Sequence, residues 1–263
     1  MRVLVTGASQ GIGASIALRL AGSGMALALA ARRQRAEFGA IIDQVRGKGA
    51  DVVAATGDLA DPSTPGRLVD AAVSKFGGLD SVVINAAIGS RGALESIEIN
   101  EWDRVHAVNV RSPWLLAVAA LPYLRRSQGS IVVVSSVSGA HPHPGTGPYS
   151  SSKAALNMLV RQMALEWAPS GVRVNAVSPG FTVTPRTQSV YEAGSPGHNR
   201  QDAVPLGRLA DPGSDMAGVV AFLLSEDAHY ITGQNVVVDG GLGDSVYLRD
   251  PMCAVNLQPL TGP

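Results

Sequence analysis

The chain has 263 residues, of which 46% are hydrophobic and 16% are charged, and this composition excludes a disordered polypeptide. Its 21 basic and 21 acidic side chains balance, which argues against nucleic acid or an anionic membrane surface as a partner. The single cysteine, Cys253, cannot form an intrachain disulfide, and no apolar run reaches the length of a membrane span. We therefore expect a cytoplasmic protein that acts on a small molecule.

Short, β-branched apolar runs alternate with longer helical patterns along the chain. Seven runs predict strands, at residues 3–6, 26–30, 51–56, 81–85, 131–135, 173–178 and 235–238. Six segments predict helices, at residues 12–23, 34–48, 62–76, 101–126, 149–168 and 213–225. Such alternation is typical of a parallel sheet with helices on both faces. The sequence therefore predicts one α/β domain over residues 1–263, a Rossmann-type doubly wound sheet of about seven parallel strands.

A glycine-rich turn follows the first predicted strand. Gly7, Gly11 and Gly13 stand in the pattern Gly-x-x-x-Gly-x-Gly just before a predicted helix. Glycines at such a turn let the backbone approach a pyrophosphate at the helix N-terminus. Any tight turn could use three glycines, but their place at the head of the α/β alternation favours a dinucleotide site.

The end of the second predicted strand bears on which dinucleotide would bind. NAD sites place a carboxylate there to accept hydrogen bonds from the ribose 2′-hydroxyl. Here Arg32 and Arg33 occupy that place, and no carboxylate occurs before Glu37. Arginine can bind a 2′-phosphate through a bidentate, charge-assisted pair. We therefore expect NADP(H), with NAD(H) possible. The alternative is that the arginines only solvate the start of the next helix.

A possible acid-base pair follows the fifth predicted strand. Tyr149 and Lys153 are four residues apart, so on a helix they share one face, and Ser136 lies on the loop that leaves the strand. The ordinary pKa of a phenol is about 10, and a nearby ammonium lowers it by favouring the phenolate. Ser136 could hold a substrate oxygen against this phenol. The three residues predict proton transfer to or from an alcohol or carbonyl oxygen.

The same region could also hold an acyl-transfer nucleophile or a metal site. Ser150-x-x-Lys153 resembles the nucleophile pair of penicillin-binding acyl transferases, which also requires Ser-Asp-Asn and Lys-Thr-Gly, and neither tripeptide occurs in the chain. His141 and His143 have no further ligands at metal-binding spacing, so we expect no metal site and assign both residues to the lining of a substrate pocket.

These motifs resemble the short-chain dehydrogenase/reductase family, in its compact one-domain branch, up to about Gly241. The resemblance rests on Thr6-Gly7-x-x-x-Gly11-Ile12-Gly13, Asn85-Ala86, Asn109, Ser136, Tyr149-x-x-x-Lys153, Pro179-Gly180, Ile231-Thr232-Gly233-Gln234 and Asp239-Gly240-Gly241. The family's usual Asn-Asn-Ala-Gly is replaced here by Ile84-Asn85-Ala86-Ala87.

The resemblance implies an oxidoreductase that transfers a hydride between a nicotinamide cofactor and a carbonyl or secondary alcohol. Tyr149 would be the general acid/base, and Lys153 would lower its pKa and hold the nicotinamide ribose. Ser136 would bind the substrate oxygen, and Asn109 would support a water-mediated proton relay to Lys153. Asp58 would contact the adenine. The residues implied at the cofactor are Gly7, Ser9, Gln10, Gly11, Ile12, Gly13, Arg32, Arg33, Asp58, Leu59, Asn85, Ala86, Ala87, Tyr149, Lys153, Pro179, Gly180, Thr182 and Thr184.

The remaining segments concern the substrate and the assembly. Residues 182–209 are too long for a plain connection and predict a mobile substrate lid, with a merely flexible surface loop as the alternative. The tail at residues 242–263 has no counterpart in the family. The predicted helices at 101–126 and 149–168 carry more apolar side chains than one sheet face needs. The family pairs these helices across two-fold axes, which implies a homotetramer, with a dimer as the alternative. The side chains in question include Trp114, Leu115, Leu116, Leu159, Met163 and Trp167.

Two other functions fit the same scaffold, because a fold does not define an activity. A non-catalytic, redox-sensing dinucleotide-binding module would be free to lose Ser136, Tyr149, Lys153 or Asn109, yet all four are present. An epimerase or dehydratase shares Tyr-x-x-x-Lys, but we would expect it to carry a larger substrate domain after the sixth strand. The sequence therefore favours the oxidoreductase.

Overall fold

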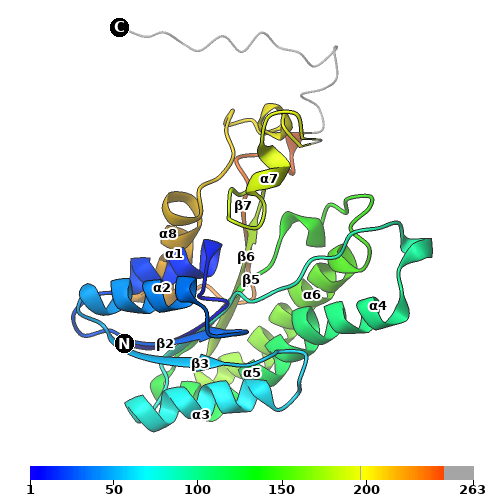
Figure 1. Ribbon diagram of the computed structural model, residues 1–263. Helices are drawn as coiled ribbons and strands as arrows, with labels where there is room; N and C mark the ends of the chain where they lie inside the picture. Colours follow the sequence, from blue (N-terminus) through cyan, green and yellow to red (C-terminus); the bar gives the residue numbers. More distant parts are fainter. Residues whose placement is uncertain (196, 246–263) are drawn as a thin grey trace, which may run out of the picture.

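Seven parallel strands form one sheet through the middle of the structure (Figure 1). The computed structural model describes residues 1–195 and 197–245. The strands are β1 (Arg2–Thr6), β2 (Ala26–Ala31), β3 (Asp51–Thr56), β4 (Ser81–Ile84), β5 (Ser130–Val134), β6 (Arg173–Pro179) and β7 (Asn235–Val238). Their order is β3-β2-β1-β4-β5-β6-β7. The predicted fold class is confirmed, because every neighbouring pair is parallel.

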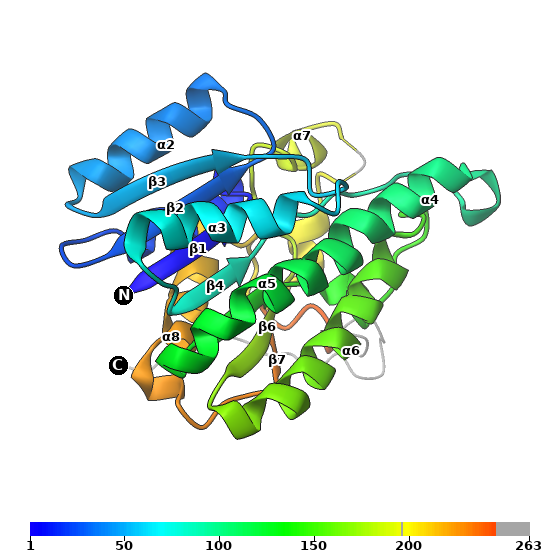
Figure 2. The same ribbon diagram turned by 90° about the horizontal axis from the view of Figure 1, so that it is seen from below.

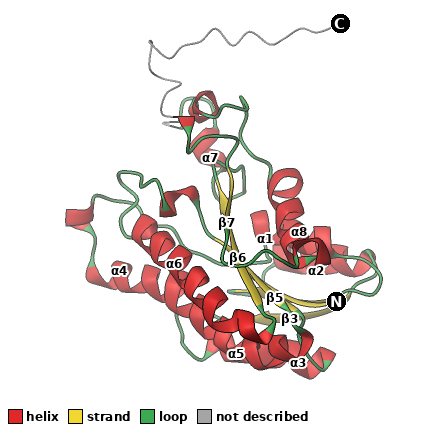
Figure 3. Cartoon of the chain, turned by 180° about the vertical axis from the view of Figure 1, so that it is seen from behind, coloured by secondary structure: helices red, strands yellow, loops and turns green. Residues whose placement is uncertain are grey.

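Helices cover both faces of the sheet (Figure 3). One face carries α1 (Gly11–Leu20), α2 (Ala36–Gly47) and α8 (Gly218–Leu224), and the other carries α3 (Thr64–Phe76), α5 (Ser112–Ser127) and α6 (Tyr149–Trp167). Figure 2 looks onto the second of these faces. Because apolar layers press on both sides, a central strand can be apolar throughout, and all five residues of β5 are buried. No helix in the described part of the chain is long and apolar enough to cross a membrane.

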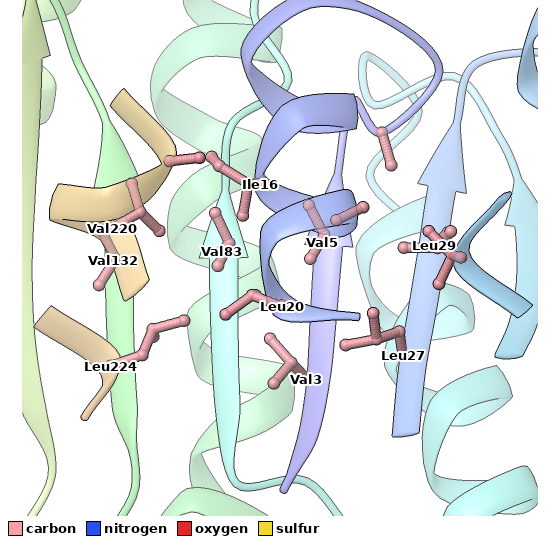
Figure 4. Packing of buried hydrophobic residues seen from close by; sticks show 14 of the residues in the cluster. Val3, Val5, Ile16, Leu20, Leu27, Leu29, Val83, Val132, Val220 and Leu224 are labelled. Carbon is pink, nitrogen blue, oxygen red and sulfur yellow. The ribbon is translucent and has the colours of Figure 1, made fainter. Parts of the chain in front are cut away.

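The face beneath α1 shows how these layers join. Val3 and Val5 of β1 meet Ile16 and Leu20 of α1, and Leu224 of α8 packs beside them (Figure 4). The helical residues are four positions apart, so they lie on one face of α1 and turn together toward the sheet. This packing fixes where α1 begins, and with it the glycine-rich turn that precedes the helix.

Two predicted helices prove to be composite. The segment predicted at residues 101–126 contains α4 (Ile99–His106), a π-helical turn (Ala107–Arg111) and α5. The predicted helix at 213–225 begins as a π-helical turn (Pro212–Ala217), whose first amides are capped by the Asp211 carboxylate, before it continues as α8. Expecting one regular helix was wrong in both cases. Apolar periodicity does not distinguish a wider turn, and a π turn depends on contacts with distant residues.

The lid segment, residues 182–209, lies beyond the ends of β6 and β7 (Figure 1). It contains a short α-helix that the sequence did not predict, α7 (Gln188–Tyr191), and a 3-10 turn at Arg200–Ala203. A bridge between Thr182 and Ala210 holds its two ends together. The lid segment is therefore a long loop whose two ends are held next to each other by this bridge.

The strand order reverses between β1 and β4, because the chain winds outward from that point in both directions. In open parallel sheets, ligands bind at such a switch point, in the crevice at the carboxyl ends of the strands. The glycine-rich turn after β1 and the loop after β4 lie at this crevice. Of the C-terminal tail predicted at 242–263, residues 246–263 lie outside the described residues.

Candidate active site

A cleft of about 1290 Å³ runs across the carboxyl ends of the central strands. It brings together nearly all the site residues expected from the sequence. Those that line it are Gly7, Ser9, Gln10, Gly11, Ile12, Arg32, Arg33, Asp58, Leu59, Asn85, Ala86, Ala87, Ser136, Tyr149, Lys153, Pro179, Gly180, Thr182 and Thr184. Gly13 and Asn109 stand behind this lining, and each shapes the cleft through its neighbours.

The glycine-rich turn packs closely against the residues that follow β4. Gly7 and Gly11 have φ angles of 67° and 56°, in the left-handed region that favours glycine. A Cβ atom at Gly13 would run into the carbonyl oxygen of Gly7. Asn85 donates from Nδ2 to the carbonyl oxygen of Thr6 at 3.0 Å, so its amide holds the turn. The resulting bare backbone before the N-terminus of α1 fits a dinucleotide pyrophosphate.

Basic side chains gather at the end of the cleft beside β2, where the sequence predicts the adenosine of the cofactor, and we call this the adenosine end. Arg32 and Arg33 line it as expected, and so does Arg35, which the sequence analysis did not single out. Asp58 accepts hydrogen bonds from Arg104 Nη2 at 2.8 Å and from the amide of Ala60 at 2.9 Å. The hydrogen bond from Arg104 is the main cause that lowers the pKa of Asp58. This carboxylate is therefore ionised and fixed in place, although nothing in the sequence pattern predicted Arg104 as its partner.

Tyr149 and Lys153 lie on one face of α6, in its first two turns, as the spacing predicted. The Lys153 side chain is only 2% exposed, and its Nζ donates to the carbonyl oxygen of Val134 at 3.0 Å. The same atom lies 5.7 Å from the centre of the Tyr149 ring. Ser136 begins the 3-10 turn after β5, where its Oγ accepts from the amide of Ser138 at 3.1 Å. Two elements, α6 and the turn after β5, thus deliver Tyr149, Lys153 and Ser136 to one end of the cleft.

Burial controls the protonation of this pair. It raises the pKa of Tyr149, although the nearby Ser136 hydroxyl and the positive charge of Arg186 act in the opposite direction. It lowers the pKa of Lys153 to about 7, with a smaller contribution from the charge of Arg186. The pKa of Tyr149 thus moves in the opposite direction to the one expected from Lys153, because desolvation disfavours the phenolate. The phenol is therefore protonated at neutral pH. Lys153 is not among the causes of this shift, and its role in activating Tyr149 stays a prediction.

The Asn109 side chain connects the loop after β4 to α6 through hydrogen bonds. Its side chain is fully buried in the π-helical turn, where Oδ1 accepts from the amide of Ile88 and Nδ2 donates to the carbonyl oxygen of Ile88, both at 2.9 Å. Nδ2 also donates to Ser152 Oγ at 3.1 Å. The loop after β4 is thereby tied to α6 just beside Lys153. The proton relay assigned to Asn109 stays a prediction.

The first part of the lid segment closes over the cleft. A Cβ atom at Gly11 would lie 3.3 Å from the side chain of Thr184, so the lid approaches the glycine-rich turn. Further along, Arg186 donates from Nη1 to the carbonyl oxygen of Ala87 at 3.1 Å, across the cleft. The sequence predicted the lid as a segment but gave no signal for Arg186, because no motif surrounds it.

A parallel sheet whose switch point holds a glycine-rich turn, a basic adenosine end and a Tyr-Lys pair defines a nicotinamide-dependent oxidoreductase. The family model described as enoyl-(acyl carrier protein) reductase matches residues 7–243. The chain belongs to the short-chain dehydrogenase/reductase family.

Similarity to known members covers most of the chain. Dehydrogenase/reductase SDR family member 4 of Sus scrofa is 37% identical over 240 residues, which cover 90% of this chain and 85% of that protein. The 3-oxoacyl-(acyl-carrier-protein) reductase FabG of Staphylococcus aureus is 38% identical over 242 residues, covering 91% and 96%. A short-chain dehydrogenase of Burkholderia cenocepacia, solved in complex with NADP, has a TM-score of 0.85 at 32% identity, covering 92% and 97%.

Proposed function

We propose that this protein transfers a hydride between NADP(H) and a carbonyl or secondary alcohol. One domain would both bind the cofactor and carry the catalytic residues. The observation that supports this most strongly is the meeting of Ser136, Tyr149 and Lys153 at one end of a cleft whose other end is the glycine-rich turn.

The chain's own residues handle the proton. In the reduction direction, Tyr149 donates its phenolic proton to the carbonyl oxygen, while the Ser136 hydroxyl hydrogen-bonds the same oxygen. A nicotinamide, when bound, supplies the hydride in that direction and accepts it in the other. Because its pKa is raised, Tyr149 is protonated at neutral pH and can act as the proton donor. Lys153, with a pKa of about 7, can release a proton at neutral pH and so help to replace the one that Tyr149 loses.

The preference for NADP(H) rests on charge at the adenosine end. Arg32, Arg33 and Arg35 line the cleft there, where an NAD site would place a carboxylate. A guanidinium can bind the 2′-phosphate through two parallel hydrogen bonds. The NADP complex of the related enzyme from Burkholderia cenocepacia supports the same preference.

Replacing Arg32 by alanine is expected to lower kcat/KM for NADPH about 10–100-fold, because a charge-assisted pair is lost, and to leave kcat/KM for NADH nearly unchanged. The measurement is oxidation of NADPH and NADH with a panel of ketones, β-ketoesters, quinones and sugars. The parent should turn over at least one of these substrates and prefer NADPH.

The matched control is Arg19→Ala, which removes an exposed arginine from the last turn of α1 and should not change the cofactor preference. A parent that prefers NADH, or an Arg32 variant whose preference does not move, would remove Arg32 from this role. A parent that binds NADPH but turns over no carbonyl compound would favour the non-catalytic module.

We propose a homotetramer on the basis of apolar side chains exposed on α5 and α6. Met158 is 61% exposed and Leu165 is 80% exposed, and Trp114 and Val118 of α5 are also exposed. Several residues first assigned to this interface are not available, because Leu116, Met163 and Trp167 are buried in the core. We expect light scattering at micromolar concentration to give the mass of four chains, or of two in the alternative arrangement. A mass of one chain would contradict the proposal.

A further inference from the structure

Arg186 places a positive charge beside the proposed catalytic groups. It lies in the lid segment, lines the cleft, and donates from Nη1 to the carbonyl oxygen of Ala87 at 3.1 Å. Its charge acts on both Tyr149 and Lys153, lowering the pKa of each. The guanidinium therefore lies close enough to the reacting end of the cleft for its charge to act there, and it also contacts the loop after β4 through Ala87.

The neighbouring loop leaves room for this guanidinium. A Cβ atom at Gly89 would lie only 2.5 Å from Arg186 Nη2, so a larger residue there would push the side chain away. A guanidinium has five N–H donors in a rigid fork. One of them is satisfied by Ala87, which leaves most of the fork available to a ligand that enters the cleft.

The walls around Arg186 are also basic. Arg91 lines the cleft from the loop after β4, and His143 lines it from the loop after β5. The two loops meet where the Gly92 amide donates to the Gly145 carbonyl oxygen at 3.0 Å. On the other side, Arg200 of the lid segment lies 5.0 Å above the ring of Phe181. We call Arg91, Arg186 and Arg200 the cationic rim.

Little negative charge offsets the cationic rim. The carboxylate that lines this end is that of Glu101, and its Oε1 already accepts a hydrogen bond from Ser90 Oγ at 2.6 Å. Within residues 1–195 and 197–245, no carboxylate forms an ion pair with Arg186 or Arg200. By contrast, Arg104 at the adenosine end is paired with Asp58. An anionic ligand group would supply the missing partner for the rim.

We propose that the substrate carries an anionic oxygen group, a carboxylate or a phosphate, which Arg186 binds while Tyr149 and Ser136 hold the reacting carbonyl oxygen, with Arg200 as a second contact. The inference rests on the proposed oxidoreductase function and names its substrate class. A charge held at a second point fixes which face of the carbonyl is presented, so Arg186 would set specificity as well as affinity.

The first test compares matched substrates. Levulinate is paired with its methyl ester, and dihydroxyacetone phosphate with dihydroxyacetone, and kcat and KM are measured in the parent, Arg186→Met and Arg186→Lys. In the parent the charged member of at least one pair should have the higher kcat/KM, and the pair that shows it separates carboxylate from phosphate. Arg186→Met should raise KM for that member about 10–100-fold and leave the neutral member within about threefold. Arg186→Lys should restore part of the loss, and Arg19→Met should behave as the parent.

The second test does not need turnover. Binding of oxamate and of its neutral isostere oxamide, and of inorganic phosphate, is measured by calorimetry on the NADPH-bound protein. Binding of oxamate or phosphate that is lost in Arg186→Met supports the inference, even if no substrate has been found. Oxamate and oxamide binding equally weakly, with phosphate not binding, would overturn it.

The cofactor offers Arg186 a different anion, its diphosphate. NADPH affinity is therefore measured by fluorescence in the same variants, and Arg186→Met should change Kd by less than about threefold. A tenfold rise in that Kd, together with equal losses on charged and neutral substrates, would assign Arg186 to the cofactor and overturn the inference. Turnover of neutral ketones with no preference for charge would overturn the inference but leave the proposed function standing.

Discussion

Replacing Tyr149 by phenylalanine is expected to lower kcat about 10²–10⁴-fold, the usual contribution of a general acid/base. Phenylalanine keeps the ring at the start of α6 but removes the hydroxyl whose proton the carbonyl oxygen would take. NADPH affinity should be nearly unchanged, because the glycine-rich turn and the basic adenosine end are intact. The measurements are steady-state NADPH oxidation and NADPH binding by fluorescence on the same protein.

Tyr123→Phe provides the matched control, since Tyr123 lies on α5 and its ring is paired with Arg126 outside the cleft. This variant should keep parental turnover. If Tyr149→Phe also keeps near-parental turnover, the proton must come from another group and the proposed mechanism is wrong.

Replacing Lys153 by methionine is expected to stabilise the chain without its cofactor while lowering kcat about 10²-fold or more. Burial lowers the pKa of Lys153 from 10.5 to about 7. That difference corresponds to roughly 5 kcal/mol, against which loss of the hydrogen bond to Val134 costs about 1–3 kcal/mol. Methionine fills a similar volume and carries no charge, so a net gain of roughly 2–4 kcal/mol in the free energy of unfolding follows near pH 6.

The gain should depend on pH. Below pH 7 the amine is protonated in both the folded and the unfolded chain, so the folded parent carries the full cost of a buried charge. Between pH 7 and 10.5 only the unfolded chain holds that proton, so the parent becomes relatively more stable as pH rises. Denaturant unfolding of parent and variant at pH 6 and pH 9 measures the difference. A variant that is less stable than the parent at pH 6, or a difference independent of pH, would contradict the burial argument.

The strands could be predicted from the sequence within one residue at either end. β5 is a short β-branched run after Ser130, and a strand buried on both faces needs little else to specify it. Regularity within helices could not be predicted in the same way. The π-helical turn holds Asn109 in position, and the partners of that side chain are Ile88, 21 positions earlier, and Ser152, 43 positions later. Only the folded chain brings these residues together.

The site residues also separate into those that local sequence patterns predict and those that depend on contacts between distant residues. Gly7, Tyr149 and Lys153 could be found because fixed spacing on one turn or one helix carries their chemistry. The protonation state of Tyr149 could not, since it depends on how deeply the fold buries the ring. Arg104 and Arg186 were missed for a related reason. Each reaches its partner from a distant element, Arg104 from α4 to Asp58 and Arg186 from the lid segment to Ala87, and no local pattern marks either one.

The central claim is hydride transfer at the cleft that holds Tyr149, and deuterium transfer measures it most directly. NADPH carrying deuterium at the transferable position of the nicotinamide is incubated with the parent and with a substrate from the ketone panel, and the alcohol is analysed by mass spectrometry and NMR. We expect one deuterium on the carbinol carbon, with the same product formed far more slowly by Tyr149→Phe. An alcohol without deuterium on that carbon, or equal rates in the two proteins, would contradict the account.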